Sequence, residues 1–371
     1  MSSHKAKVSW EAICKPKQEG GLGLRSLKEA NDVCCLKLIW RIASHGDSLW
    51  VKWLETYLLK QKSFWSIKSN TVLGSWIWKK LLKYRGVAKK FCKVEVKNGN
   101  STSFWYDNWS TLGRLVDVVG ERGVIDLGIQ RGMSVAEAWH SRRSRRHRTE
   151  ALNQIENVLA VSKQNRTEAV DIVLWRGRND MYRPQFSTRD TWNHIRTTTN
   201  KVAWHRGIWF THATPKFSFC LWLAVLNRLS TGDRMARWNV RSSVACVFCN
   251  HCMETRDHLF FTCVYASEIW TATAKNLLKA RYTTDWQTLI TIVSEMQRNR
   301  VESFLLRYAL QASVYTIWRE RNGRKHGEKP NSATRLIGWI DKQIRNNLSS
   351  IRIMGDRRYE EGLQIWFASR V

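Results

Sequence analysis

Four side chains that commonly bind metal ions fall within eighteen consecutive residues, in the order Cys246-x2-Cys249-x8-His258-x4-Cys263. Two cysteines separated by two residues can face one ion from a tight turn, and a His and a Cys separated by four residues can complete a tetrahedron from the next element. Thiolate and imidazole ligands together suit Zn²⁺, and four protein ligands leave no open position for a substrate water. The spacing therefore predicts one structural zinc ion.

Two alternatives remain at this motif. His251 and Cys252 stand close to the four residues, and the sequence leaves open whether either of them replaces a ligand. Cysteine is also among the most buried residue types, so a metal-free core is the second alternative. An iron–sulfur cluster of the ferredoxin type is excluded, because Arg256 occupies the position of its fourth cysteine. The polar, turn-like residues 250–257 favour the zinc site over a core helix.

Further short stretches stand around the motif in a fixed order: Pro215-Lys-Phe-Ser-Phe-Cys-Leu-Trp222, Asn227-Arg228, Asp233-Arg234, Cys246-x2-Cys249, Glu254-Thr255-x2-His258-Leu-Phe-Phe-x-Cys263 and Ile269-Trp270. Together they resemble a known family, the zinc-binding domain that follows the reverse transcriptase in plant LINE-type non-LTR retrotransposons. The resemblance implies a structural zinc site, and its departures are an additional cysteine, Cys252, and Gly232 where a helix-forming residue is expected.

Looser resemblances to the same retroelements lie on both sides of this region. The string from Val8 to Leu24, with Gly20-Gly21-Leu22-Gly23, resembles the segment that follows the polymerase domain. Asp107 and Trp109 resemble a Trp-x-Asp-x-Trp region, and residues 314–322 resemble a helix that trails the zinc domain. Together these matches imply that the chain corresponds to the part of a reverse transcriptase downstream of its polymerase.

The charge of the chain points to a polyanionic partner. Lys and Arg number 61 against 31 Asp and Glu, which gives a net charge of +30. Such a charge repels itself unless a polyanion neutralises it, so RNA or DNA is the first partner to consider, and a merely basic surface is the alternative. Near the zinc motif, the candidate contacts with nucleic acid are Lys216, Arg228, Arg234 and Arg237. A basic cluster supplies four more: Arg142, Arg143, Arg145 and Arg146. Instead of binding nucleic acid, this cluster could be a nuclear-import signal or a solvated linker.

Other function classes are disfavoured. No two aspartates are adjacent, whereas polymerases of this kind hold two metal ions with paired acids, so we expect no enzymatic activity and no small-molecule substrate. The longest apolar run, Phe217 to Leu226, is too short to span a bilayer, so we expect no membrane partner. Nine cysteines without framework spacing, together with a polar and basic N-terminus, indicate a reducing intracellular compartment, nuclear rather than cytoplasmic.

The expected fold is mostly α with short β-hairpins, in which a small zinc-stabilised helical domain is flanked by helical segments. One hairpin is expected at 94–105, where Asn98-Gly99 suits a type I′ turn, and another joins 171–175 to 185–187. Tryptophans between residues 50 and 109 are interspersed with lysines. The tryptophans could stack on the bases of a nucleic acid or pack in a hydrophobic core, and we favour the core for most of them. The expected segments are a Trp-rich connector (1–135), a basic linker and helix (136–170), the zinc domain (171–275) and a helical region (276–371).

These observations favour a zinc-binding, nucleic-acid-associated fragment of a retroelement reverse transcriptase that lacks the polymerase motif. The alternatives are a structural module that binds a partner polymerase domain, and a non-functional remnant. The sequence does not distinguish RNA from DNA.

Overall fold

The computed structural model describes residues 7–60, 62–68, 71–141, 145–237, 244–295 and 299–370. By contacts the chain divides into two compact units: the helical unit, Met1–Leu24 with Thr199–Val371, and the sheet unit, Arg25–Thr198. Both are mostly helical, and the one named sheet in the described residues is small, so the predicted fold class is confirmed. The two units meet after residues 24 and 198, which are not boundaries of the four segments expected from the sequence. The division into four segments stays a prediction.

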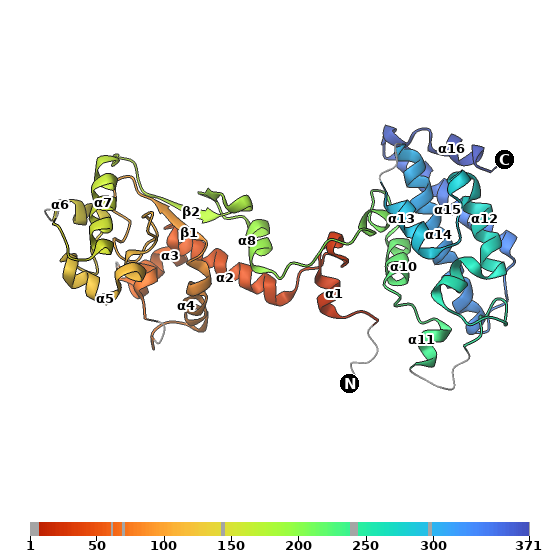
Figure 1. The fold of residues 1–371 in the computed structure, drawn as a ribbon, viewed down its shortest axis with the longest axis horizontal. Coiled ribbons are helices and arrows are strands. Elements are labelled where there is room, and N and C mark those ends of the chain that lie inside the picture. The colour runs from red at the N-terminus through yellow and green to blue at the C-terminus, as the bar shows by residue number, and fades with distance from the viewer. Residues whose placement is uncertain are drawn as a thin grey trace. The chain divides into compact units, whose positions relative to one another are not determined.

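The sheet unit contains three short antiparallel strands in the order β1-β2-β3, of which β1 and β2 are labelled in Figure 1. They are β1 (Cys92–Glu95), β2 (Ile172–Arg176) and β3 (Tyr182–Arg183). Cys92 pairs with Trp175, and Arg176 pairs with Tyr182. The second predicted hairpin is therefore present, with its return strand at 182–183 instead of 185–187.

The first predicted hairpin, at 94–105, is wrong, because β1 pairs with β2 instead of with the residues after the turn. Gly99 does take the left-handed conformation, with φ of 72°. The carboxylate of Asp171 accepts hydrogen bonds from the backbone N–H groups of Lys97 and Gly99, at 2.7 and 2.9 Å. These bonds tie the turn to the start of β2, so no return strand forms next to β1.

Side chains from the helices and from β1 and β2 together form the hydrophobic core of this unit. Of the seven tryptophans between residues 50 and 109, Trp65, Trp78, Trp105 and Trp109 are buried, as the core interpretation predicts, whereas Trp53 and Trp76 are exposed. Two of these helices, α2 and α4, pack against each other. The helices are α2 (Leu27–Ala43), α3 (Leu49–Leu54), which continues as a π-helical turn (Glu55–Leu59), α4 (Trp76–Ala88), α5 (Leu115–Leu127), α6 (Val135–His140), α7 (Glu150–Gln164) and α8 (Thr188–Ile195).

The helical unit is built around one long helix, α14 (Arg300–Lys325), which packs against α10, α12 and α15 (Figure 1). Asn299 starts α14, since its side-chain oxygen accepts the N–H groups of Val301 and Glu302, at 2.7 and 3.1 Å. The other helices are α1 (Trp10–Cys14), α9 (His205–Ile208), α10 (Pro215–Val225), α11 (Gly232–Ala236), α12 (Val264–Leu278), α13 (Trp286–Ser294), α15 (Ala333–Ile353) and α16 (Gly362–Ala368).

The glycine-rich N-terminal segment belongs to this unit. The indole N–H of Trp222 on α10 donates to the carbonyl of Gly20 at 2.8 Å, and the N–H of Val202 donates to the carbonyl of Gln18 at 2.9 Å. Gly20 has φ of 92°, a conformation that few other residues adopt. The segment is thus held by contacts with residues about 200 positions later. Among the described residues, no helix is both long and apolar enough to cross a membrane.

Candidate metal centre

The first half of the candidate site is a tight knuckle. Ala245 and Met253 form an isolated antiparallel bridge, and the N–H of Cys246 donates to the carbonyl of Cys252 at 2.8 Å. Between them Asn250 takes the left-handed conformation, with φ of 57°, and its N–H donates to the carbonyl of Cys246 at 2.8 Å. The chain therefore reverses within a few residues, which directs Cys246 and Cys249 to the same side.

The second half comes from a π-helical turn, His258–Thr262, that leads into α12. The N–H of Cys263 donates to the carbonyl of His258 at 2.8 Å, which closes the turn. Nε2 of His258 faces Cys249, while Nδ1 lies 3.4 Å from the hydroxyl oxygen of Thr262. A partner on the second ring nitrogen is typical of metal-binding histidines, because it fixes the orientation of the ring.

The four predicted side chains come together with dimensions that suit zinc. Their ligand atoms all lie within 4.8 Å of one another. Sγ of Cys246 is 3.9 Å from Sγ of Cys263, and Sγ of Cys249 is 3.4 Å from Nε2 of His258. A zinc tetrahedron with bonds of about 2.3 Å to sulfur and about 2.0 Å to nitrogen sets its ligand atoms about 3.5 to 3.8 Å apart. The cluster can therefore hold one zinc ion.

The two neighbouring candidates, His251 and Cys252, are exposed side chains outside this group of four. Cys246 and Cys263 are buried, whereas Cys249 and His258 are half-buried. The hydrogen bond between the two buried thiols raises the pKa of Cys246 and lowers the pKa of Cys263. Zinc binds thiolates, so a bound ion would displace the protons of both groups.

A buried ion pair fixes the knuckle to α14. The carboxylate of Glu254 accepts hydrogen bonds from Nε and Nη2 of Arg321, at 3.0 and 2.5 Å, and from the N–H of Gly232 at 2.8 Å. Nη2 of Arg321 also donates to the carbonyl of Ser230 at 2.9 Å. Both charged side chains are almost completely buried. One pair therefore joins the knuckle, the segment before α11 and the C-terminal part of α14.

A close approach of the backbone explains the glycine that departs from the family pattern. A Cβ atom on Gly232 would lie 3.0 Å from both Cβ of Glu254 and the carbonyl oxygen of Val244. Glycine is therefore favoured at this position because the knuckle leaves little room for a side chain, although another residue would form a helix more readily.

Arg324 makes a second contact between α14 and the knuckle. Its guanidinium lies 4.9 Å from the ring centre of Phe248 and 4.4 Å from that of Tyr265. These two rings pack with their centres 4.7 Å apart. Phe248 stands between the two cysteines of the knuckle, so this contact joins α14 to the first half of the cluster. From the sequence, residues 314–322 were expected only to resemble a helix that trails the zinc domain, so the contacts of Arg321 and Arg324 with the knuckle were not predicted.

Three of the predicted cationic contacts lie together next to the knuckle. Arg228 and Arg237 are exposed, and Arg234 is half-buried and donates to the carbonyl of Asn227. Burial lowers the pKa of Arg234, and the charges of Arg228 and Arg237 lower it further, which indicates that the three guanidinium groups are close. We name Arg228, Arg234 and Arg237 the arginine cluster.

The other predicted cations lie elsewhere. Lys216 is exposed at the far end of α10, about 16 Å of helix away. Its ammonium lies 5.4 Å from the ring centres of Phe217 and Tyr315. Arg145 and Arg146 are exposed residues of the sheet unit, and Arg142 and Arg143 fall outside the described residues. Helix α10 begins at Pro215, and the preceding Thr214 forms no capping bond but instead bonds the hydroxyl of Tyr308 at 2.8 Å.

The segment that contains this site matches a known protein family. Residues 186–270 match the family described as zinc-binding in reverse transcriptase. The resemblance inferred from the sequence is thus confirmed for this segment, which includes all four residues of the cluster. The match ends before α13, so it contains neither Arg321 nor Arg324.

One relative extends the likeness beyond this segment. The Arabidopsis thaliana protein named "Putative ribonuclease H protein At1g65750" is 25% identical over 281 residues, which cover 71% of this chain and 43% of the relative. The chain therefore spans less than half the length of that protein. The search of solved structures gave no significant match.

Proposed function

We propose that this chain is a zinc-stabilised nucleic-acid-binding fragment of a retroelement reverse transcriptase, from the part downstream of the polymerase. Cys246, Cys249, His258 and Cys263 are its zinc ligands, and the ion has a structural role. The arginine cluster contacts the phosphates of the RNA of the element or of its target DNA. The family match at residues 186–270 and the net charge of +30 support this function.

The observation that carries the proposal is the connection between the arginine cluster and the knuckle. The N–H of Gly232 donates to the side chain of Glu254, and the N–H of Asp233 donates to its carbonyl at 3.2 Å. These bonds attach α11, which carries Arg234, to the segment between Cys252 and His258. A zinc ion that orders this segment would therefore also order the arginines, and fixed cations suit contacts with a phosphate backbone.

The role that we propose is binding and not catalysis. A zinc ion with four protein ligands has no open position for a water or substrate. The relative from Arabidopsis has ribonuclease H in its name, but the match covers 43% of that protein, so it carries no argument for nuclease activity here. The lack of adjacent aspartates in the sequence supports the absence of polymerase activity from this proposal.

A salt titration of binding tests the proposal. We expect the affinity for a labelled RNA or duplex DNA to fall steeply between 50 and 200 mM salt, because phosphate contacts release counterions. Arg228→Ala and Arg237→Ala should each weaken binding and reduce the salt slope by about 1, whereas Arg352→Ala, an exposed arginine outside the cluster, should have little effect. An affinity that does not change with salt, or equal effects of all three variants, would refute it.

A second candidate function is docking on the polymerase domain of the element. Leu49, Trp53 and Tyr57, spaced four residues apart along α3 and the turn that follows, are 87%, 49% and 60% exposed. Such an apolar row on one helix face is typical of a protein contact. Heparin discriminates the two functions, since it should displace nucleic acid from the arginine cluster and leave an apolar protein contact largely intact.

We also propose a reducing, nuclear location. All nine cysteines have free thiols, and the exposed Arg145 and Arg146 belong to the basic cluster that resembles a nuclear-import signal. Loss of nuclear accumulation of a fluorescent fusion after both arginines are changed to alanine would test the location.

A further inference from the structure

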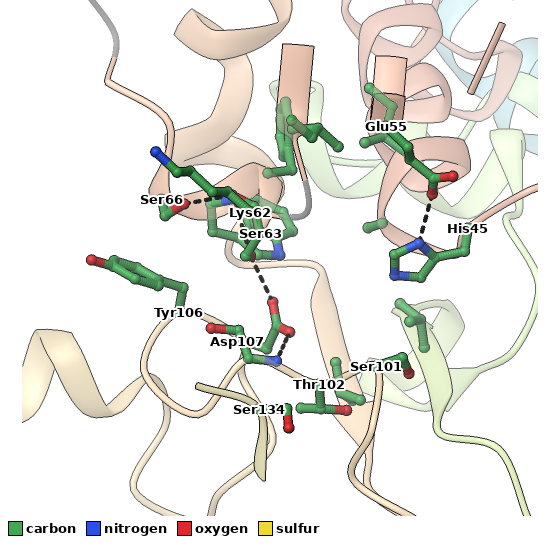
Figure 2. A pocket seen from close by; sticks show the side chains of 18 of the residues that line it. His45, Glu55, Lys62, Ser63, Ser66, Ser101, Thr102, Tyr106, Asp107 and Ser134 are labelled. Atoms are coloured by element: carbon green, nitrogen blue, oxygen red, sulfur yellow. Dashed lines mark hydrogen bonds and ion pairs between the residues drawn. The ribbon is translucent and has the colours of Figure 1, made fainter. Parts of the chain in front are cut away.

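The sheet unit contains a cavity of about 900 Å³ that is lined by both polar and apolar residues, whereas the four candidate zinc ligands belong to the helical unit. This volume falls within the range of about 300 to 1,000 Å³ that is typical of small-molecule sites. Figure 2 shows Lys62, Ser63 and Ser66 on one side of the cavity, Ser101, Thr102 and Ser134 on the other, and Asp107 between them. Every residue of the proposed site comes from this single unit.

Four hydroxyl groups of the wall, those of Ser63, Ser66, Ser101 and Thr102, donate their protons to the protein and so present oxygen atoms to an occupant. Ser63 donates its proton to the carboxylate of Asp107 at 3.2 Å, and Ser66 donates to the carbonyl of Ser63 at 2.8 Å. On the opposite side, Ser101 and Thr102 both donate to the carboxylate of Asp171, at 3.1 and 2.7 Å. A hydroxyl that has donated its proton retains lone pairs that accept. The wall therefore selects an occupant that is rich in hydrogen-bond donors.

The charged residues that line the cavity favour an occupant with a negatively charged group at one end. Both lining carboxylates have partners: Glu55 contacts Nδ1 of His45 at 2.7 Å, and Asp107 accepts from Ser63 and from the N–H of Ser103 at 2.6 Å. In contrast, Lys60 and Lys62 are exposed at the rim, and neither forms an ion pair with any residue that the structure describes. A phosphate would satisfy both ammonium groups.

From these two features we propose that the cavity binds a ribonucleotide unit, with its phosphate at Lys60 and Lys62 and its ribose and base donors against the hydroxyl wall. The 2′-hydroxyl supplies a donor that deoxyribose lacks, so the site prefers ribonucleotides. The unit comes either from a free nucleotide or from an RNA strand. This proposal does not depend on the arginine cluster, which belongs to the other unit.

Calorimetric titration of the full chain with adenosine 5′-monophosphate tests the site. We expect adenosine and deoxyadenosine 5′-monophosphate to bind at least several-fold more weakly, because the first lacks the phosphate and the second lacks the 2′-hydroxyl. Lys62→Glu should weaken binding of the nucleotide at least tenfold. Lys68→Glu, the same charge change at an exposed lysine outside the cavity, should leave it unchanged.

An oligoadenylate RNA distinguishes the two sources of the nucleotide. It is titrated into a chain that carries Arg228→Ala and Arg237→Ala, so that binding at the arginine cluster does not obscure the result. If the RNA binds with the same dependence on Lys62 while the monophosphate does not bind, the site takes a nucleotide within a strand. The proposal is overturned if Lys62→Glu changes binding of neither probe, or if adenosine binds as well as its monophosphate.

Discussion

Glu254 in the metal-binding knuckle and Arg321 near the end of α14 form a buried ion pair with an N–O distance of 2.5 Å, across 67 residues of sequence. A charge in such a place is stable only while its partner is present, since an unpaired buried ion loses its hydration without compensation. The candidate zinc site is therefore linked to a helix that lies outside the family match.

Removal of the guanidinium should destabilise the helical unit strongly. We expect Arg321→Ala to lower its free energy of unfolding by about 3 to 5 kcal/mol, because Glu254 is left buried and unpaired. Arg319→Ala, at an exposed position two residues earlier, should cost less than about 1 kcal/mol. Urea denaturation followed by tryptophan fluorescence measures both values. Equal midpoints for the two variants would show that the pair does not support the fold.

Truncation tests whether the matched segment is sufficient to hold the metal. A chain that ends at residue 275 loses both Arg321 and Arg324, whereas one that ends at residue 332 keeps them. Both lose α15, so the comparison isolates residues 276–332. We expect the longer chain to retain zinc against a competing chelator and the shorter chain to release it. Equal retention would mean that the knuckle needs no support from α14.

Burial makes the stability of the sheet unit depend on pH. Desolvation raises the pKa of Asp107 from 3.8 to about 6, although hydrogen bonds from Ser103 and Ser63 act in the opposite direction. The folded state therefore holds this proton more tightly than the unfolded state. The resulting stability is present below pH 4 and is lost as the pH rises through about 6, with a total of about 3 kcal/mol.

The Asp107→Asn variant isolates this effect, since the amide is neutral at every pH and keeps the shape of the side chain. We expect the decrease in unfolding free energy between pH 4 and pH 7 to be smaller in the variant than in the parent by about 2 kcal/mol. Denaturant titrations at several pH values measure the difference. Identical pH profiles would contradict a raised pKa at Asp107.

The features that could be predicted from sequence are those with local signals. The four residues of the cluster follow one another within a turn and the next element, so their spacing alone predicts that they meet. The start of α10 at Pro215 and the burial of most tryptophans were likewise predictable from local pattern. Each of these signals depends on neighbours within a few residues.

Pairings between distant segments were not predictable. The Asn98-Gly99 turn suggested a hairpin, but Asp171 binds that turn and β2 takes the place of the expected partner strand. Arg321 carries no local sign that it is buried, because its partner is 67 residues away. Lys216 was grouped with the arginine cluster by sequence position, and the length of α10 separates them.

Zinc stoichiometry of the full chain tests the central claim most directly. Elemental analysis should find one zinc ion per chain in the parent protein and in Cys252→Ser, which changes an exposed thiol outside the cluster. His258→Ala should lose the ion, and chelation of the parent should lower the unfolding midpoint of the helical unit, since structural zinc contributes to folding free energy. A parent chain that folds without zinc, or a His258→Ala variant that keeps a full equivalent, would contradict the account.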